Sequence, residues 1–113
     1  MVEIKAIIRL DRLEGVLHAI RQVPGSSGVT VSKVEGFGRE QPPRVESGGF
    51  GRVLMAKVET VVPRGRAETI LAAITEAAAT GRAGDGKIFV LPVESVINIG
   101  HGGRAESDAP ATE

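Results

Sequence analysis

The chain has 113 residues, with 14 basic and 14 acidic side chains and a formal net charge of zero, so we expect one domain and no nucleic-acid partner. It contains no cysteine, which excludes disulfides, thiolate metal sites and cysteine nucleophiles. The N-terminus lacks a signal-peptide pattern and no apolar run approaches the ~20 residues that span a bilayer, so a cytoplasmic protein is expected.

The first part of the chain predicts a strand, a helix and a second strand. Alternating apolar and polar residues indicate the strand over residues 2–10. Asp11 is expected to cap the helix, with Glu14 three residues later as in a capping box. The helical spacing continues to about Gln22, and residues 29–35 have the pattern of the second strand.

A long connection follows at residues 36–52. It contains five glycines and two adjacent prolines and has no apolar periodicity. This composition predicts an exposed loop. Because a loop of this length in a compact domain usually has a function, we expect it to be functional.

The remaining elements repeat the first pattern. Residues 53–62 predict a third strand, and a second helix is indicated by an apolar stripe made of Ile70, Leu71, Ile74, Ala77 and Ala78. Gly81 is expected to cap that helix, and residues 80–87 to form a tight turn before a fourth strand at 88–91. A short further strand is predicted at 93–99.

This order of elements predicts a ferredoxin-like α+β sandwich, βαββαβ, over residues 1–99. Residues 100–113 contain few apolar side chains and are expected to form a flexible tail. The fold alone does not specify a function.

Two glycine-rich segments are the best candidates for a binding site: Gly36-Phe37-Gly38-Arg39 and Gly84-Asp85-Gly86-Lys87. Successive backbone N–H groups in such segments can bind an anion, and Arg39 and Lys87 would add positive charge. Asp85-Gly86 is also a favoured hairpin-turn dipeptide, and the first segment can equally be a bulge. Spacing alone leaves both interpretations open.

The segment TGRAGDGKIFVLPVE, residues 80–94, resembles the signature of the PII signal-transduction proteins. GFGR, residues 36–39, resembles the start of the long T-loop of that family, which would here span about residues 37–52. The resemblance implies a ferredoxin-like homotrimer with adenine nucleotides in clefts between subunits. It also implies a regulator, not an enzyme, that contacts a partner protein through the T-loop.

Carried over by position, the resemblance implies a nucleotide site in which Thr30 contacts the adenine and Lys87 with its glycines holds the phosphates. The implied residues are Ile7, Gly28, Val29, Thr30, Gly36, Phe37, Gly38, Arg39, Glu59, Val61, Gly84, Asp85, Gly86 and Lys87. A second ligand would lie at the base of the T-loop, against Gly38, Arg39, Glu40 and Gln41. No metal site is expected, and whether Mg²⁺ accompanies the nucleotide is left open.

The sequence departs from the family pattern at several positions. It has no tyrosine, which excludes uridylylation of a T-loop tyrosine. Glu40 stands where the family has a glutamine that supports Mg²⁺ and 2-oxoglutarate, and Met55 stands where a lysine pairs with 2-oxoglutarate. Asn98 and Gly100 stand where two arginines reach the distal phosphates of ATP.

These departures suggest a divergent sensor that favours ADP or AMP over ATP, with bicarbonate as a second ligand in inorganic-carbon regulation. The partner would be a transporter, an enzyme or a carbon-fixation component. The alternatives are a nitrogen-regulatory protein that responds to ATP and 2-oxoglutarate, and a PII-like protein of a metal-efflux system. Slow phosphate hydrolysis and a scaffold without nucleotide affinity remain as further alternatives.

Overall fold

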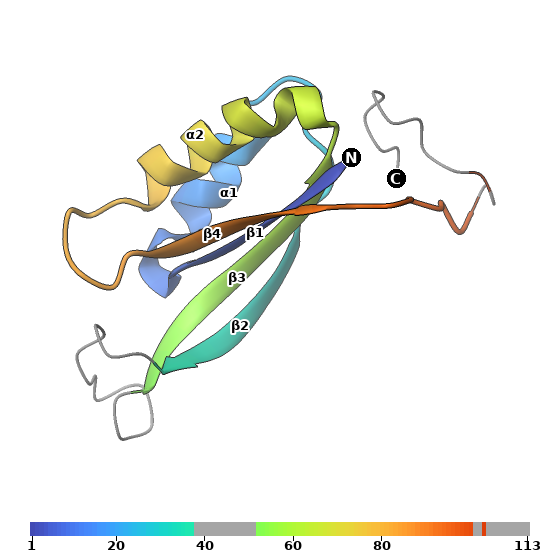
Figure 1. The fold of residues 1–113 in the computed structure, drawn as a ribbon. Helices are drawn as coiled ribbons and strands as arrows, with labels where there is room; N and C mark the ends of the chain where they lie inside the picture. Colours follow the sequence, from blue (N-terminus) through green and yellow to red (C-terminus); the bar gives the residue numbers. More distant parts are fainter. Residues whose placement is uncertain (38–51, 101–102, 104–113) are drawn as a thin grey trace.

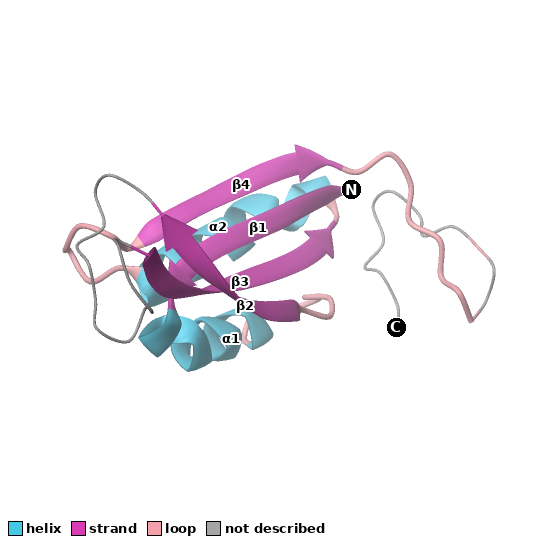
Figure 2. Cartoon of the chain, turned by 90° about the horizontal axis from the view of Figure 1, so that it is seen from below, coloured by secondary structure: helices cyan, strands magenta, loops and turns pink. Residues whose placement is uncertain are grey.

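Two helices cover one face of a four-stranded antiparallel sheet (Figures 1 and 2). This computed structural model describes residues 1–37, 52–100 and 103. The strands are β1 (Val2–Arg9), β2 (Thr30–Phe37), β3 (Arg52–Val62) and β4 (Gly86–Pro92), and their order in the sheet is β2-β3-β1-β4. The helices are α1 (Leu13–Arg21) and α2 (Ala67–Ala78). The predicted α+β architecture, with its ferredoxin-like order of elements, is therefore confirmed.

The core lies between the sheet and the helices. Alternate residues of β1 point toward the helices and are buried: Val2, Ile4, Ala6 and Ile8. Antiparallel partners share a face of the sheet, so β3 adds the side chains paired with them, which include Ala56, Val58 and Val62. The helices complete the core with Val16, Ile20, Ile70 and Ile74.

The other face of the sheet carries the intervening residues. Ile7 lies between Lys57 of β3 and Lys87 of β4, and Lys5 lies between Glu59 and Phe89. None of the described helices lies over this face (Figure 2). Its side chains include charged ones and partly exposed apolar ones, and also the buried Arg9 and Met55, which are cross-strand partners.

The start of α1 differs from the prediction. The chain forms a 3-10 turn over Leu10–Arg12, and α1 begins at Leu13 with Arg12 in the N-cap position and no side-chain cap. The prediction that Asp11 caps the helix is therefore wrong. The N–H of Leu13 already donates to the carbonyl of Leu10, so the tight turn replaces the expected capping box.

The end of α2 also differs from the prediction. The helix ends at Ala78, and Ala79 is already extended, with ψ 135°. Gly81 has φ +79°, but it lies in the following loop and does not cap the helix. At 12 residues α2 is the longest described helix, and none of the described helices is long and apolar enough to span a membrane.

The predicted strand at residues 93–99 is not formed. All of these residues are described, and Ile97 alone makes an isolated bridge. The N–H of Val93 donates to the carbonyl of Met1 at 3.0 Å. Beyond this point β4 has passed the start of β1, its neighbour in the sheet, and no described strand remains beside it to continue the ladder.

Candidate functional site

The glycine loop, defined here as residues 80–87, connects α2 to β4. Gly84 and Gly86 have positive φ angles of +88° and +111°, which favour glycine. A Cβ on Gly86 would lie 1.8 Å from the carbonyl oxygen of Ile7. The loop therefore packs its backbone directly against β1. It is not a hairpin turn, because it follows a helix and Gly86 is already paired with Ile8.

Asp85 organises this loop through both oxygens of its carboxylate. Oδ1 accepts hydrogen bonds from Arg9 Nε at 2.8 Å and from the Thr80 hydroxyl. Oδ2 accepts from the backbone N–H groups of Thr80 at 2.8 Å and Gly81 at 3.2 Å. The hydrogen bonds from Thr80, and then the one from Arg9, hold the pKa of Asp85 well below its usual range. The carboxylate is thus ionised at neutral pH and committed to contacts within the chain.

Lys87 and Ile7 are cross-strand partners on the helix-free face of the sheet. Lys87 is exposed, and Ile7 is partly buried. On the other side of Ile7, the Lys57 ammonium lies 3.8 Å from the Glu59 carboxylate. Lys87 consequently presents a positive charge beside an apolar side chain, immediately after the two positive-φ glycines of the loop.

A second group of predicted residues lines a hollow of about 280 Å³ at the start of β2 and the end of β3. Its lining is Glu3, Ser27, Gly28, Thr30, Glu59, Thr60 and Val61. The Thr60 hydroxyl donates to the carbonyl of Gly28 at 3.0 Å, which fixes the entry into β2. The neighbouring Val29 packs against the core. The hollow combines an exposed threonine hydroxyl, a carboxylate and an apolar side chain.

One chain does not bring those predicted residues that the structure describes into a single pocket. The hollow lies at the start of β2, whereas the glycine loop lies at the start of β4, at the opposite end and on the opposite edge of the sheet (Figure 1). Gly36 and Phe37 lie at the far end of β2, where Phe37 is 78% exposed. They share an end of the sheet with the glycine loop but are separated from it by β3 and β1, three spacings of about 4.8 Å.

The second-ligand residues predicted from the sequence, Gly38, Arg39, Glu40 and Gln41, lie outside the described residues. Met55, which the resemblance to the family aligns with a lysine, is described and is 1% exposed. It is paired with Arg9 on one side and Val34 on the other. It therefore places an apolar side chain in the same cross-strand row as Arg9.

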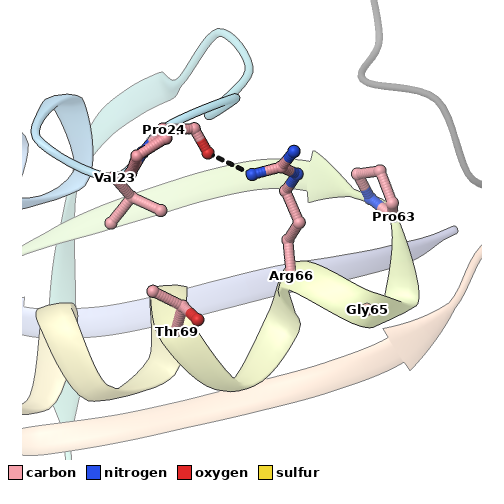
Figure 3. Close-up of a pocket in the computed structure, with 6 residues that line it drawn as sticks. All are labelled: Val23, Pro24, Pro63, Gly65, Arg66 and Thr69. Carbon is pink, nitrogen blue, oxygen red and sulfur yellow. Dashed lines mark hydrogen bonds between the residues drawn. The ribbon is translucent and has the colours of Figure 1, made fainter.

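A larger hollow of about 440 Å³ lies between the α1–β2 connection and the start of α2 (Figure 3). It is lined by Val23, Pro24, Pro63, Gly65, Arg66 and Thr69, none of which was predicted as a site residue. Arg66 donates to the carbonyl of Pro24 across it. In the described part of the chain, no three histidine, aspartate or glutamate side chains gather in a way that would hold a metal ion.

Sequence reasoning missed Arg9 and Thr80. Arg9 has the alternation expected of a polar residue on an exposed strand face, yet it is 4% exposed. Its partner Asp85 is 76 residues away in the chain. The only signal in the sequence was Asp85, an aspartate between two glycines just before a strand. The sequence did not show that a buried cation pairs with it, because that pairing depends on the order of the strands in the sheet.

The fold agrees with what comparison with known proteins gives. The family model for nitrogen regulatory protein P-II matches residues 1–103. The chain is 43% identical over 103 residues to nitrogen regulatory protein P-II of Rhizobium meliloti (strain 1021), covering 88% of this chain and 91% of that protein. It is 41% identical over 109 residues to the P-II homolog of Arabidopsis thaliana, covering 92% of this chain. The chain spans only 55% of the length of that plant relative.

Among solved structures, the crystal structure of Arabidopsis thaliana PII bound to citrate matches with a TM-score of 0.77 and 39% identity, covering 93% of this chain and 88% of that one. The architecture is thus that of a ferredoxin-like regulatory protein. This chain belongs to the PII family of signal-transduction proteins.

Proposed function

We propose that this PII-family protein is a homotrimeric regulator that binds an adenine nucleotide between two subunits. The observation that carries the proposal is the division of the implied site residues between the glycine loop and the hollow at Thr30. These groups lie at opposite ends of one sheet, so a single cleft requires a second copy of the chain. One copy would contribute Lys87 and the glycine backbone, and the next copy the hollow.

The proposed preference is for ADP or AMP over ATP. Lys87 is an exposed cation at the end of the glycine loop. The resemblance to the family aligns two arginines that reach the distal phosphates with Asn98 and Gly100. Neither residue carries a charge. Each charge-assisted hydrogen bond contributes about 1.5–3 kcal/mol. The loss of the two arginines therefore weakens the binding of ATP most, because ATP carries the most phosphate charge.

The proposed second ligand is bicarbonate. Met55 is buried and apolar at the position that the resemblance aligns with a lysine, and the Arg9 guanidinium in the same row is already paired with Asp85. A thioether cannot pair with a carboxylate, which argues against 2-oxoglutarate. Bicarbonate is small, and Arg39 with neighbouring backbone N–H groups would hold it. The partner would then belong to inorganic-carbon handling, as a transporter, an enzyme or a carbon-fixation component.

The nitrogen-regulatory alternative is supported by the names of the relatives, and the Arabidopsis structure carries citrate, a carboxylate ligand. Isothermal titration of nucleotide-free protein with ATP, ADP and AMP, each alone and then with bicarbonate or 2-oxoglutarate, separates the two. Tighter binding of ADP or AMP that bicarbonate strengthens supports the proposal. Tight binding of ATP that depends on 2-oxoglutarate would establish the nitrogen-regulatory alternative.

Signalling would proceed through the T-loop. Ligand contacts at Gly38, Arg39 and Glu40 would select particular loop conformations, and a partner protein would bind one of them. Because the coupling between two binding sites is reciprocal, the partner must change nucleotide affinity by the same factor. Hydrogen exchange of residues 39–52 with and without saturating ADP tests this step, and identical exchange in both states would contradict it.

A further inference from the structure

Arg9 is a buried cation for which the nucleotide proposal has no role. It ends β1 on the helix-free face of the sheet and is 4% exposed. A buried charge is costly unless it is paired and hydrogen-bonded. Its Nε donates to Asp85 at 2.8 Å, and its Nη2 donates to the carbonyl of Ala83. Both contacts are made to the glycine loop.

The contacts of Arg9 reach both halves of the loop. Asp85, held by Arg9, accepts in turn from the backbone N–H groups of Thr80 and Gly81, at the beginning of the loop. The Ala83 carbonyl immediately precedes Gly84, and a Cβ on Gly84 would lie 3.5 Å from Arg9 Nη2. One guanidinium on β1 therefore fixes where the loop starts and where its glycines turn.

β1 holds the loop at a second point, two residues earlier. The backbone of Gly86 lies against the carbonyl of Ile7 so closely that no side chain fits. With the loop fixed on both sides of Gly84 and Gly86, their N–H groups have little freedom to reorient. Fixed donors bind an anion better than mobile ones, because less conformational entropy is lost on binding.

We propose that Arg9 is a positioning residue of the nucleotide site, which acts through Asp85 and Ala83 to hold the glycine loop in the conformation that receives nucleotide phosphates. This inference rests on the proposed function. Arg9 does not contact the nucleotide in this scheme, since Nε and Nη2 are directed at the loop. Its effect is therefore confined to the phosphate end of the ligand and leaves the adenine end unchanged.

The test is isothermal titration of the full chain with ADP and, separately, with adenosine, which lacks phosphates. Arg9→Met removes both contacts, and Arg9→Lys keeps the charge but cannot bridge two acceptors with the same geometry. At metal sites, residues that orient the metal-binding groups typically contribute roughly 10–100-fold to affinity, and we take the same range for a residue that orients phosphate-binding groups. We expect Arg9→Met to lower the affinity for ADP roughly tenfold or more and Arg9→Lys to lower it less. Neither variant should change the affinity for adenosine.

Arg12→Met is the matched control, since Arg12 is exposed in the turn that follows β1 and its replacement should leave both affinities unchanged. Hydrogen exchange of ligand-free Arg9→Lys, a variant that retains the charge and should fold, gives an independent readout, with faster exchange expected at Thr80 and Gly81. Two results would overturn the inference while the proposed function stands, provided that wild-type protein binds ADP. Either the Arg9 variants lose affinity for ADP and adenosine equally, or they lose affinity for neither. Wild-type protein without ADP affinity overturns both.

Discussion

Gly86 is the residue with the strictest steric requirement in the site. Its φ is +111°, and a Cβ added there would lie 1.8 Å from the Ile7 carbonyl oxygen, so both the backbone conformation and the space exclude a side chain. Gly15 in α1 is the opposite case, because a Cβ there meets no atom within 4 Å. Gly86 is thus required by a close approach of two backbone segments, whereas nothing around Gly15 requires a glycine.

We expect Gly86→Ala to destabilise the protein by about 3 kcal/mol or more, because strain and overlap with β1 act together. Gly15→Ala should stabilise it, but by less than the usual gain of about 0.5–1 kcal/mol in a helix interior, because Gly15 lies in the first turn of α1. Urea unfolding of both variants measures the difference. A Gly86→Ala protein as stable as wild type would mean that the loop does not pack on Ile7 as described.

Asp85 makes the stability of the protein depend on pH. Its pKa is lowered in the folded chain by hydrogen bonds from Thr80 and then Arg9, whereas an unfolded aspartate has a pKa of about 3.9. Its contribution is therefore fully present above about pH 5 and is lost as the pH falls through the unfolded value toward the lowered folded pKa. The urea midpoint of wild type should drop more steeply between about pH 5 and about pH 2.5 than that of Asp85→Asn. Parallel profiles would contradict this assignment.

At the scale of elements, α2 packs on the sheet, and the turn before it contacts the α1–β2 connection. Ile70 and Ile74 are fully buried against the sheet, and Arg66, just before the helix, donates to the carbonyl of Pro24 beyond α1. The guanidinium also lies over Gly25, where it occupies the space within 3 Å of the position that a Cβ would take. The start of α2 thereby holds the connection that leads to Gly28 and the hollow.

Ile70→Ala should lower the free energy of unfolding by about 2–5 kcal/mol, because it leaves a cavity between α2 and the sheet. Thr69→Ala, at the exposed neighbouring position, is the control and should change stability by no more than about 0.5 kcal/mol. Chemical denaturation of the two variants compares them directly. Equal effects would contradict the assigned orientation of α2.

Arg66→Ala should loosen the α1–β2 connection without unfolding the core. The expected result is faster hydrogen exchange at the amides of residues 25–28, with the exchange of β1 unchanged, since the lost contact is local. The hydrogen bond to Pro24 is exposed, so the cost in stability should stay near about 1 kcal/mol. Exchange that rises throughout the sheet would show that Arg66 supports the whole fold.

At the scale of the whole molecule, β4 is an edge strand with apolar side chains in solvent. Phe89 and Leu91 are 47% and 38% exposed and share the helix-free face. Exposed apolar patches commonly mark interfaces. Together with the separated halves of the proposed cleft, this surface supports an assembly in which a neighbouring subunit covers β4.

Light scattering on the purified chain should give a mass three times the 11.8 kDa of one chain. Phe89→Glu should reduce that mass and the affinity for ADP together, because both the interface and the cleft need the neighbouring copy. Ala72→Glu adds the same charge on the exposed side of α2 and should change neither. A Phe89→Glu monomer that still binds ADP with wild-type affinity would place the nucleotide site within one chain.

The sequence by itself determined the order of elements and the family. Strand alternation in residues 2–10 and the apolar stripe around Ile70 depend on neighbours a few positions away, and such local patterns survive without knowledge of the fold. The segment at residues 80–94 identified the family for the same reason. The predicted cap of the first helix was wrong because a 3-10 turn precedes that helix. The predicted strand at 93–99 was wrong because its neighbour β1 does not extend beside it.

The tertiary structure alone decided which distant residues meet. The sheet order β2-β3-β1-β4 brings Arg9 beside Asp85 across 76 residues of sequence and separates the glycine loop from Gly36 by two strands. Sequence spacing contains no information about strand order or about which partner neutralises a buried charge. The burial of Arg9 in the structure does identify that partner, because a cation removed from water must find its hydrogen-bond acceptors within the fold.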